Sequence, residues 1–299
     1  MSNALQSRLL ITGARGHLGS RVAELLLDAG ASNLVAASRD PSKLDALRAR
    51  GAETPKADFD DIATLDAAFA GAERLLIVST DALGVPGLRL RQHKAAVEAA
   101  IKAGIKHIVY TSMPNPEPGS LIPFAPDHYE TEQAIEQSGI AFTILRNSWY
   151  AENLLRSLPQ VLSSGKWFTS AGEGRVANVA REDAARAAAA VLASGETASA
   201  RHDITGPQAL TTAQIAAIAS EVAGKPIEVV QVSDEQLAQG LAGAGIQEGY
   251  VPLLVAFEAN TRAGKADVAS DAVRRLTGTP SQSLRDFLTA HRAAFAPNS

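Results

Sequence analysis

The 299-residue chain has no cysteine, few aromatic residues and no long hydrophobic run. The absence of cysteine excludes disulfide bonds, thiol catalysis and zinc–thiolate sites. With 5% aromatic residues, a net charge of −4 and no basic cluster, nucleic acid is not an expected ligand. No apolar stretch approaches the roughly 20 residues that a membrane span requires. The six histidines are scattered without metal-ligand spacing, so no metal site is expected.

The N-terminal residues pass almost directly into an apolar run, without the charged and apolar segments of a secretion signal. Together with the missing cysteines, this favours a cytoplasmic protein. The hydrophobic content of 46% and charged content of 20% are those of an ordinary globular protein. Either one large domain or two modest domains fit this length.

The chain is organised around residues 8–29, where an apolar run at 9–11 is followed by a loop with Gly13, Gly16 and Gly19. This order predicts a strand, a tight turn and a helix that begin a mononucleotide-binding βαβ unit. Gly13 would allow the sharp turn, Gly16 the approach of a pyrophosphate, and Gly19 the close packing of helix on strand. The helix N-terminus would supply free N–H groups to the phosphates. An ordinary strand-to-helix turn remains the alternative.

Apolar strands then alternate with helices, which predicts an α/β fold with a doubly wound parallel Rossmann sheet. The expected strands are residues 9–11, 33–38, 53–57, 74–79, 105–110 and 140–146. The expected helices between them are residues 43–50, 61–70, 88–103 and 127–138. Ligands of such sheets bind outside the carboxyl ends of the strands.

Beyond residue 150 the alternation becomes irregular. We expect residues 1–150 to form the nucleotide-binding domain and residues 151–299 a smaller, mostly helical substrate lobe, with some segments returning to the sheet. Its expected strands are residues 166–169, 176–179, 201–205 and 227–232. Its expected helices are residues 181–193, 212–223, 234–243, 250–262 and 283–294. The proline-rich segment 113–126 is either a flap over a pocket or a plain surface loop.

The end of the second predicted strand indicates which nicotinamide cofactor is preferred. Ser38, Arg39 and Asp40 follow that strand, where the adenosine ribose is usually bound. An arginine there pairs with a 2′-phosphate, whereas a carboxylate accepts from the ribose hydroxyls. Because Arg39 comes first, we expect NADPH, with NADH possible but weaker. A solvated arginine at a helix start is the alternative.

Four stretches carry a resemblance to a known family: ITGARGHLG, YTS after the fifth strand, DHYETEQAIEQSGIAFTILRNSWYAEN, and LTGTPSQSLRDFL. With these, the chain resembles the NmrA-like atypical short-chain dehydrogenases over essentially its whole length, and most of all the bacterial type 2 NAD(P)H:quinone oxidoreductases. The segment 127–153 is the most specific. The resemblance implies an NADPH-dependent reductase that passes hydride to a quinone-like small molecule without a flavin, as a monomer or homodimer.

The resemblance also implies functional residues. Around the cofactor it places Gly13, Arg15, Gly16, His17, Leu18, Gly19, Arg39, Asp58, Phe59, Ser79, Thr80, Thr111 and Ser112. On the quinone side it places His128, Tyr129, Asn147 and Trp149, of which the first three are our catalytic candidates. Exposure of His128 behind a capping Asp127, and a plain turn role for Asn147, are the alternatives.

The chain departs from the wider superfamily because no tyrosine belongs to a Tyr-x-x-x-Lys motif. Residues 114, 133, 154 and 254, four positions after the tyrosines, are Pro, Gln, Leu and Leu. Quinones need mainly orientation and hydrogen bonds to their oxygens, so quinone reduction does not require that motif. Two other hypotheses remain: a non-catalytic NADP(H) sensor that regulates a protein partner, and a reductase of another conjugated substrate such as a dye or an enone.

Overall fold

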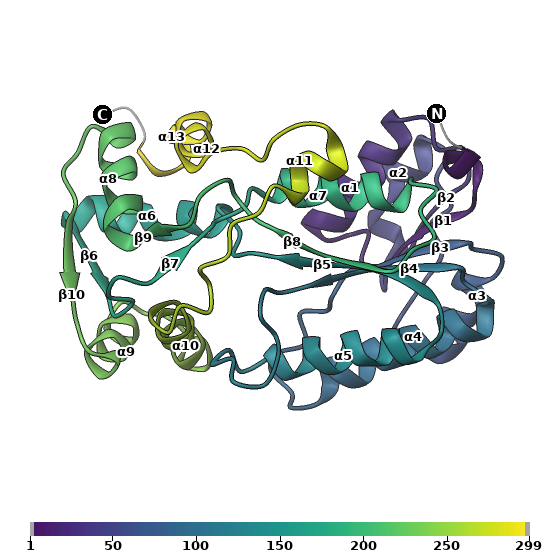
Figure 1. The fold of residues 1–299 in the computed structure, drawn as a ribbon, viewed down its shortest axis with the longest axis horizontal. Coiled ribbons are helices and arrows are strands. Elements are labelled where there is room, and N and C mark those ends of the chain that lie inside the picture. The colour runs from purple at the N-terminus through teal and green to yellow at the C-terminus, as the bar shows by residue number, and fades with distance from the viewer. Residues whose placement is uncertain (1–2, 297–299) are drawn as a thin grey trace.

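The computed structural model describes residues 3–296, and its centre is a six-stranded parallel sheet between two layers of helices (Figure 1). The strand order is β2-β1-β3-β4-β5-β8. The bounds are β1 Leu9–Ile11, β2 Leu34–Ala36, β3 Arg74–Ile77, β4 His107–Ser112, β5 Ala141–Asn147 and β8 Ala200–Ile204. The predicted doubly wound α/β fold is confirmed.

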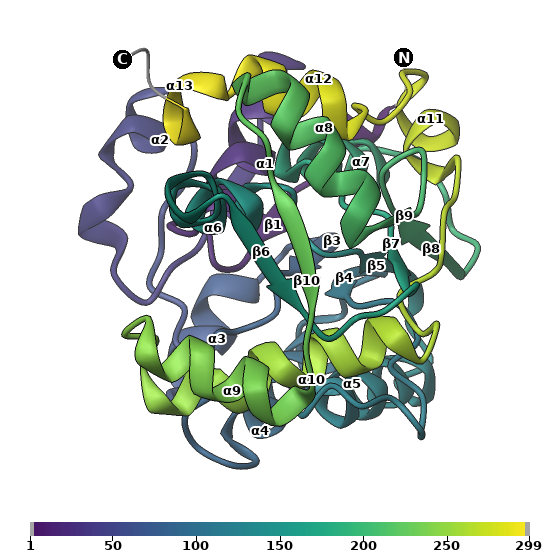
Figure 2. The same cartoon turned by 90° about the vertical axis from the view of Figure 1, so that its left-hand side faces the viewer.

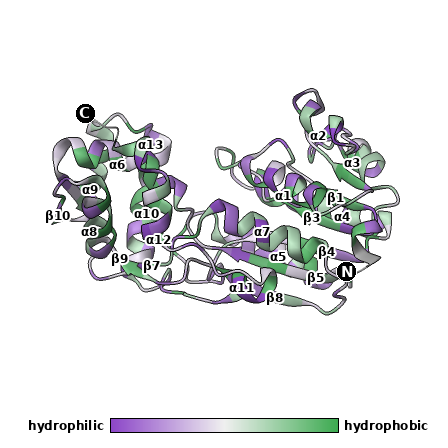
Figure 3. Ribbon diagram, turned by 90° about the horizontal axis from the view of Figure 1, so that it is seen from above, coloured by the Kyte–Doolittle hydropathy of each residue, from purple (hydrophilic) through white to green (hydrophobic). Residues whose placement is uncertain are grey.

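The sheet is covered on both faces, which explains its continuous apolar strands. Every residue of β1, β2, β3 and β4 is buried. One face packs against α1 His17–Asp28, α2 Asp45–Ala49, α7 Arg181–Leu192 and α11 Ala272–Thr277. The other packs against α3 Ile62–Phe69, α4 Leu88–Ala103 and α5 Ala125–Gln137. The strands are accordingly among the most hydrophobic segments in Figure 3.

The remaining C-terminal elements gather at the end of the molecule away from α2 and α3 (Figure 3), which is the end that faces the viewer in Figure 2. Two small sheets pair β6 with β10 in parallel and β7 with β9 in antiparallel orientation. Their strands are β6 Lys166–Thr169, β7 Arg175–Val176, β9 Leu210–Thr211 and β10 Glu228–Gln231. The helices are α6 Glu152–Ser164, α8 Thr212–Ala223, α9 Asp234–Gly243, α10 Val251–Arg262, α12 Leu284–Ala290 and α13 Arg292–Phe295.

This C-terminal part has its own core, formed by α6, α8 and α12. Three short 3-10 helices complete the fold: Asn3–Gln6, Pro41–Lys43 and Glu248–Tyr250. Within residues 3–296, no helix has the length and apolarity needed to cross a bilayer. Residues beyond 150 also contribute to the central layers: β8 is a strand of the six-stranded sheet, and α7 and α11 pack on one of its faces.

Several segments differ from the sequence prediction. Neither α11 nor β9 was predicted, the strand expected at 176–179 is reduced to the short β7, and the helix expected at 283–294 is divided into α12 and α13. Residues 53–57 lie beside β2 but form only isolated bridges, at Glu53 and Lys56. Pro55, between them, has no N–H to donate to a ladder, which interrupts the strand. The helix α6 was not predicted, and it contains Pro159. Its buried Leu154, Leu158 and Leu162 recur every four residues, which is the signal that indicates it.

Candidate functional site

The glycine loop joins β1 to α1 in a conformation that requires glycine. Gly13 has φ +65°, a region that L side chains rarely adopt. A Cβ added to Gly19 would lie 2.4 Å from the Gly13 carbonyl oxygen, so α1 packs against the loop without room for a side chain. Gly16 precedes α1 in extended conformation and caps it with no side chain. The first N–H groups of α1 therefore lack a side-chain acceptor, which suits them to an anion.

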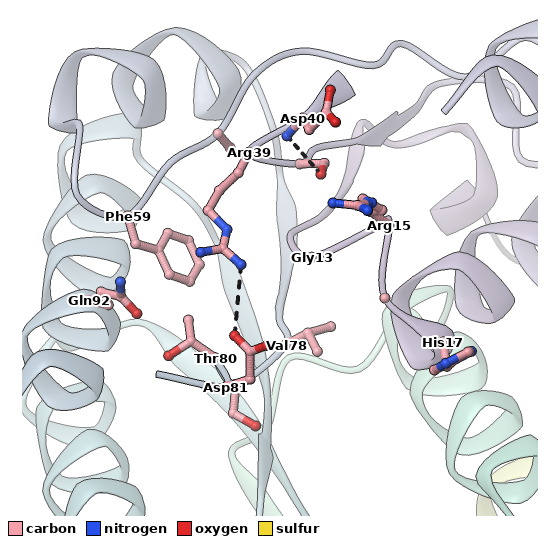
Figure 4. Close-up of a pocket in the computed structure, with 14 residues that line it drawn as sticks. Gly13, Arg15, His17, Arg39, Asp40, Phe59, Val78, Thr80, Asp81 and Gln92 are labelled. Atoms are coloured by element: carbon pink, nitrogen blue, oxygen red, sulfur yellow. Dashed lines mark hydrogen bonds and ion pairs between the residues drawn. The ribbon is translucent and has the colours of Figure 1, made fainter. Parts of the chain in front are cut away.

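A cavity of about 450 Å³ opens beside this loop, outside the carboxyl ends of β1, β2 and β3 (Figure 4). Its lining comes from the glycine loop, from the residues after each of these strands and from α4. The lining residues are Gly13, Arg15, Gly16, His17, Ser38, Arg39, Asp40, Ala57, Phe59, Val78, Ser79, Thr80, Asp81 and Gln92. Eight of the thirteen predicted cofactor residues are in this set: Gly13, Arg15, Gly16, His17, Arg39, Phe59, Ser79 and Thr80.

The cavity carries mixed charge near the end of β2. Arg39 and Arg15 supply two cations, and Asp40 and Asp81 supply two carboxylates. Asp40 Oδ1 accepts from Ser42 Oγ at 2.6 Å and from the Ser42 N–H at 3.2 Å. These bonds, with smaller contributions from nearby cations, lower the pKa of Asp40. The cavity can therefore bind both an anionic group and ribose hydroxyls at this end.

Three predicted cofactor residues shape the walls without lining the cavity. Leu18 is on the buried face of α1, and Gly19 packs against Gly13. Asp58 stabilises a turn, since its Oδ1 accepts from the Asp60 N–H at 3.2 Å. The adenine contact that the resemblance implies at positions 58 and 59 is therefore represented in the lining by Phe59 alone.

The other two, Thr111 and Ser112, lie at the end of β4 behind the cavity. Thr111 Oγ1 accepts from the Ser79 N–H at 2.9 Å and so holds a residue that lines the cavity. Ser112 Oγ donates to the buried Glu132 carboxylate at 2.5 Å. Both hydroxyls are occupied by other residues of the chain.

Four lining residues were missed by the sequence analysis: Ala57, Val78, Asp81 and Gln92. Val78 and Asp81 flank the predicted pair Ser79-Thr80. A prediction that included one more residue on each side of that pair, at the end of β3, would have found both. Gln92 is on α4 and is brought to the cavity only by the packing of that helix. Its Nε2 donates to Asp60 Oδ2 at 2.8 Å, whereas its buried Oε1 has no partner within residues 3–296.

His128 is 3% exposed and packs against Phe124 of the loop 113–126, so it does not lie on the surface, and it does not line the cavity. Arg89 donates to His128 Nε2 at 2.8 Å, so the ring proton is on Nδ1 and is donated to the Tyr110 hydroxyl at 2.8 Å. The Arg89 guanidinium also lies 5.0 Å from the ring centroid of Phe124, from that loop. Burial, followed by the positive charge of Arg89, holds the pKa of His128 well below its usual range. His128 is therefore a neutral residue of the core.

His93 connects this buried cluster to the cavity. Its Nε2 accepts from the N–H of Thr80 at 3.0 Å, and its Nδ1 contacts Thr131 Oγ1 at 3.0 Å. Thr131 Oγ1 in turn donates to the Asp127 carbonyl at 2.6 Å. Burial lowers the pKa of His93 to about 3, with a smaller contribution from Arg89. The neutral ring can thus accept from Thr80 and fix the segment after β3.

Asn147 ends β5, at the same edge of the sheet as Thr111 and Ser112. Its Nδ2 donates to the Tyr150 hydroxyl at 3.2 Å, and its buried Oδ1 has no partner in the described part of the chain. Burial raises the pKa of Tyr150, which keeps the phenol protonated. At the carboxyl end of β5, the Asn147 oxygen can therefore accept a hydrogen bond and the Tyr150 hydroxyl can donate one.

Aromatic rings gather where the sheet edge meets the C-terminal part. Trp149 packs against Phe257 of α10, with ring centroids 3.9 Å apart, and Phe257 is 6.0 Å from Phe124. Tyr129, the remaining catalytic candidate, is half-buried on α5. Among residues 3–296, no group of three or more His, Cys, Asp or Glu side chains could hold a metal ion.

Known proteins match this chain over nearly its whole length. Quinone oxidoreductase 2 of Escherichia coli is 35% identical over 282 residues, covering 94% of this chain and 97% of the relative. The solved structure of the E. coli NADPH-dependent quinone oxidoreductase with NADPH has a TM-score of 0.89 at 34% identity, covering 95% and 99% of the two chains. The Citrobacter sp. triphenylmethane reductase with NADP(H) has a TM-score of 0.87 at 33% identity, with the same coverage.

The model of the NmrA-like family matches residues 5–274. This range includes the glycine loop, all lining residues of the cavity and all three catalytic candidates. The chain therefore belongs to the NmrA-like family.

Proposed function

We propose that this NmrA-like oxidoreductase uses NADPH to reduce a quinone or a similar conjugated acceptor, by direct hydride transfer without a flavin. The observation that carries the proposal is that the uncapped N-terminus of α1 and Arg39 open into one cavity. A dinucleotide with a 2′-phosphate has anionic groups suited to both. The similar proteins named above, which reduce quinones or a dye with the same cofactor, support the reaction class.

The residues of the cavity fit NADPH on structural grounds. Gly13 and Gly19 leave backbone rather than side chains beside the helix N-terminus, as a pyrophosphate requires. Phe59 supplies an apolar ring that can pack against the adenine, and the Arg39 guanidinium can donate two parallel hydrogen bonds to the 2′-phosphate. The buried hydroxyl of Thr80 has no partner within residues 3–296, which leaves it for a ribose. When bound, NADPH supplies a hydride from C4 of its nicotinamide.

Asn147 and Tyr150 are the groups that can orient the acceptor. The amide Oδ1 of Asn147 is unsatisfied in the described chain, and burying it without a partner is costly. Tyr150 accepts from Asn147, so its own proton remains available to an acceptor oxygen. Four residues after Tyr150, where a Tyr-x-x-x-Lys motif would have lysine, the chain has Leu154. Because burial also raises its pKa, Tyr150 acts as a neutral hydrogen-bond donor rather than as a base. The proton that completes the reduction then comes from water or from Tyr129.

His128 and Tyr129 are assigned different roles. Both ring nitrogens of His128 are hydrogen-bonded inside the protein, so it supports the site through Tyr110 and Arg89 rather than protonating the product. Tyr129 is half-buried on the same helix, and it remains the second candidate for a proton donor on the acceptor side.

Sensing of NADP(H) without turnover is the competing function, and the missing Tyr-x-x-x-Lys motif is its basis. A catalyst and a sensor would share the cavity, and they differ in whether NADPH is consumed. Reduction of dyes is a variant of the proposal, because it needs the same cofactor and only a different acceptor. Relative kcat/KM values over quinones and dyes separate these acceptor classes.

Arg39→Ala tests the cofactor assignment. A charge-assisted hydrogen bond is worth about 1.5–3 kcal/mol, so kcat/KM for NADPH is expected to fall by roughly 10- to 100-fold. The value for NADH, which lacks the 2′-phosphate, stays within about threefold. The measurement is initial rates at varied cofactor and fixed quinone. Arg50→Ala is the control, since Arg50 pairs with Asp28 outside the cavity. An equal loss for both cofactors would contradict the assignment.

A further inference from the structure

The only ion pair of Arg39 within residues 3–296 crosses the cavity to Asp81. Arg39 follows β2, and Asp81 belongs to the segment between β3 and α4, so the two residues come from strands on opposite sides of β1. Figure 4 shows the two side chains reaching toward each other from opposite walls. Any group that binds Arg39 from inside the cavity must therefore compete with a carboxylate.

The pair is loose and open to solvent. Arg39 Nη2 lies 3.8 Å from Asp81 Oδ1, and the two side chains are 68% and 91% exposed. Exposed pairs of this kind are weak, and salt screens them further. A phosphate with nearly two negative charges and three acceptor oxygens displaces such a carboxylate readily, but at a cost in affinity.

The neighbouring carboxylate, that of Asp40, forms no ion pair with Arg39 within residues 3–296. Asp40 also lines the cavity, but its Oδ1 is held by both the hydroxyl and the N–H of Ser42. Arg39 and Asp81 make no such bonds to other side chains in the described residues. Asp81 is thus the carboxylate that competes for Arg39.

We propose that Asp81 is a specificity-determining residue, which lowers the preference for NADPH over NADH by competing with the 2′-phosphate for Arg39. This inference rests on the proposed function of the cavity. NADH has a hydroxyl in place of that phosphate, so its binding leaves the Arg39–Asp81 pair intact. The carboxylate therefore weakens NADPH and leaves NADH unaffected.

The test is the affinity of Asp81→Asn for NADP⁺ and NAD⁺, measured by titration calorimetry without an acceptor. Because the exposed pair is weak, we expect NADP⁺ to bind about two- to fivefold more tightly. The affinity for NAD⁺ is expected to change less than twofold. Asp66→Asn, which removes an equal charge from an exposed pair with Lys102, should change neither affinity.

A double variant tests whether Asp81 acts on the 2′-phosphate through Arg39. In an Arg39→Ala background, Asp81→Asn should alter NADP⁺ affinity by less than twofold, because the guanidinium for which Asp81 and the 2′-phosphate compete has been removed. A persisting gain would overturn the proposal, since the carboxylate would then repel the phosphate directly. Weaker binding of both cofactors to Asp81→Asn would also overturn it, by making Asp81 a ligand for the nucleotide. Failure of the wild-type protein to bind NADP⁺ would instead remove the proposed function itself.

Discussion

Gly19→Ala is expected to weaken NADPH binding by about 10- to 100-fold. The added Cβ would lie 2.4 Å from the Gly13 carbonyl oxygen and 2.9 Å from its carbonyl carbon. Both are backbone atoms of a loop with positive φ, so no flexible side chain can move aside. Overpacking of this kind costs about 1–3 kcal/mol, and α1 must shift away from the loop. The shift moves the helix N–H groups out of the position that a pyrophosphate needs.

Titration calorimetry with NADPH measures this loss, and urea unfolding separates it from loss of the fold. Gly240→Ala is the matched control, because Gly240 is also helical and a Cβ there meets nothing within 4 Å. That control should keep wild-type affinity and gain up to about 1 kcal/mol in stability. Wild-type affinity in a folded Gly19→Ala protein would contradict the role given to the loop.

Glu132→Ala is expected to lower the free energy of unfolding by about 3–5 kcal/mol. Glu132 is 1% exposed and binds Arg146 through both carboxylate oxygens, at 2.7 and 3.1 Å. It also accepts the Ser112 hydroxyl at 2.5 Å. Its removal leaves Arg146 half-buried, and within residues 3–296 the one acidic partner left to it is the exposed Glu117. A buried charge that loses its main partner is costly because the remaining contacts replace only part of the lost interaction.

Chemical denaturation gives this value, with Glu130→Ala as the control. Glu130 is on the same helix but forms an exposed pair with Lys94, so its removal should cost less than about 1 kcal/mol. Equal stabilities of the two variants would show that the buried pair does not hold the ends of β4 and β5 together.

The sequence predicted those parts of the site that depend on neighbouring residues. Gly13, Gly16 and Gly19 have their reasons within one strand–turn–helix unit, so their spacing indicated the loop correctly. Arg39 was placed on the cavity because strand exits in a parallel sheet meet at one edge. The strand expected at 53–57 was wrong in detail, since a single proline interrupts its ladder.

Contacts between distant segments could not be predicted in this way. His128 was expected either at the surface or in the acceptor pocket, whereas Tyr110 and Arg89 hold it in the core. Those partners are 18 and 39 residues away, and no local pattern connects them to it. Gln92 reaches the cavity for the same reason, through the packing of α4.

The central claim is that the protein consumes NADPH when a conjugated acceptor is present. The most direct measurement is the decrease in absorbance at 340 nm with 1,4-benzoquinone, menadione, an azo dye and a triphenylmethane dye, without added flavin. The enzyme-free rate is subtracted, because quinones react slowly with NADPH on their own. We expect acceptor-dependent turnover that is faster with NADPH than with NADH. Saturable NADPH binding without oxidation by any of these acceptors would contradict it and favour the sensor.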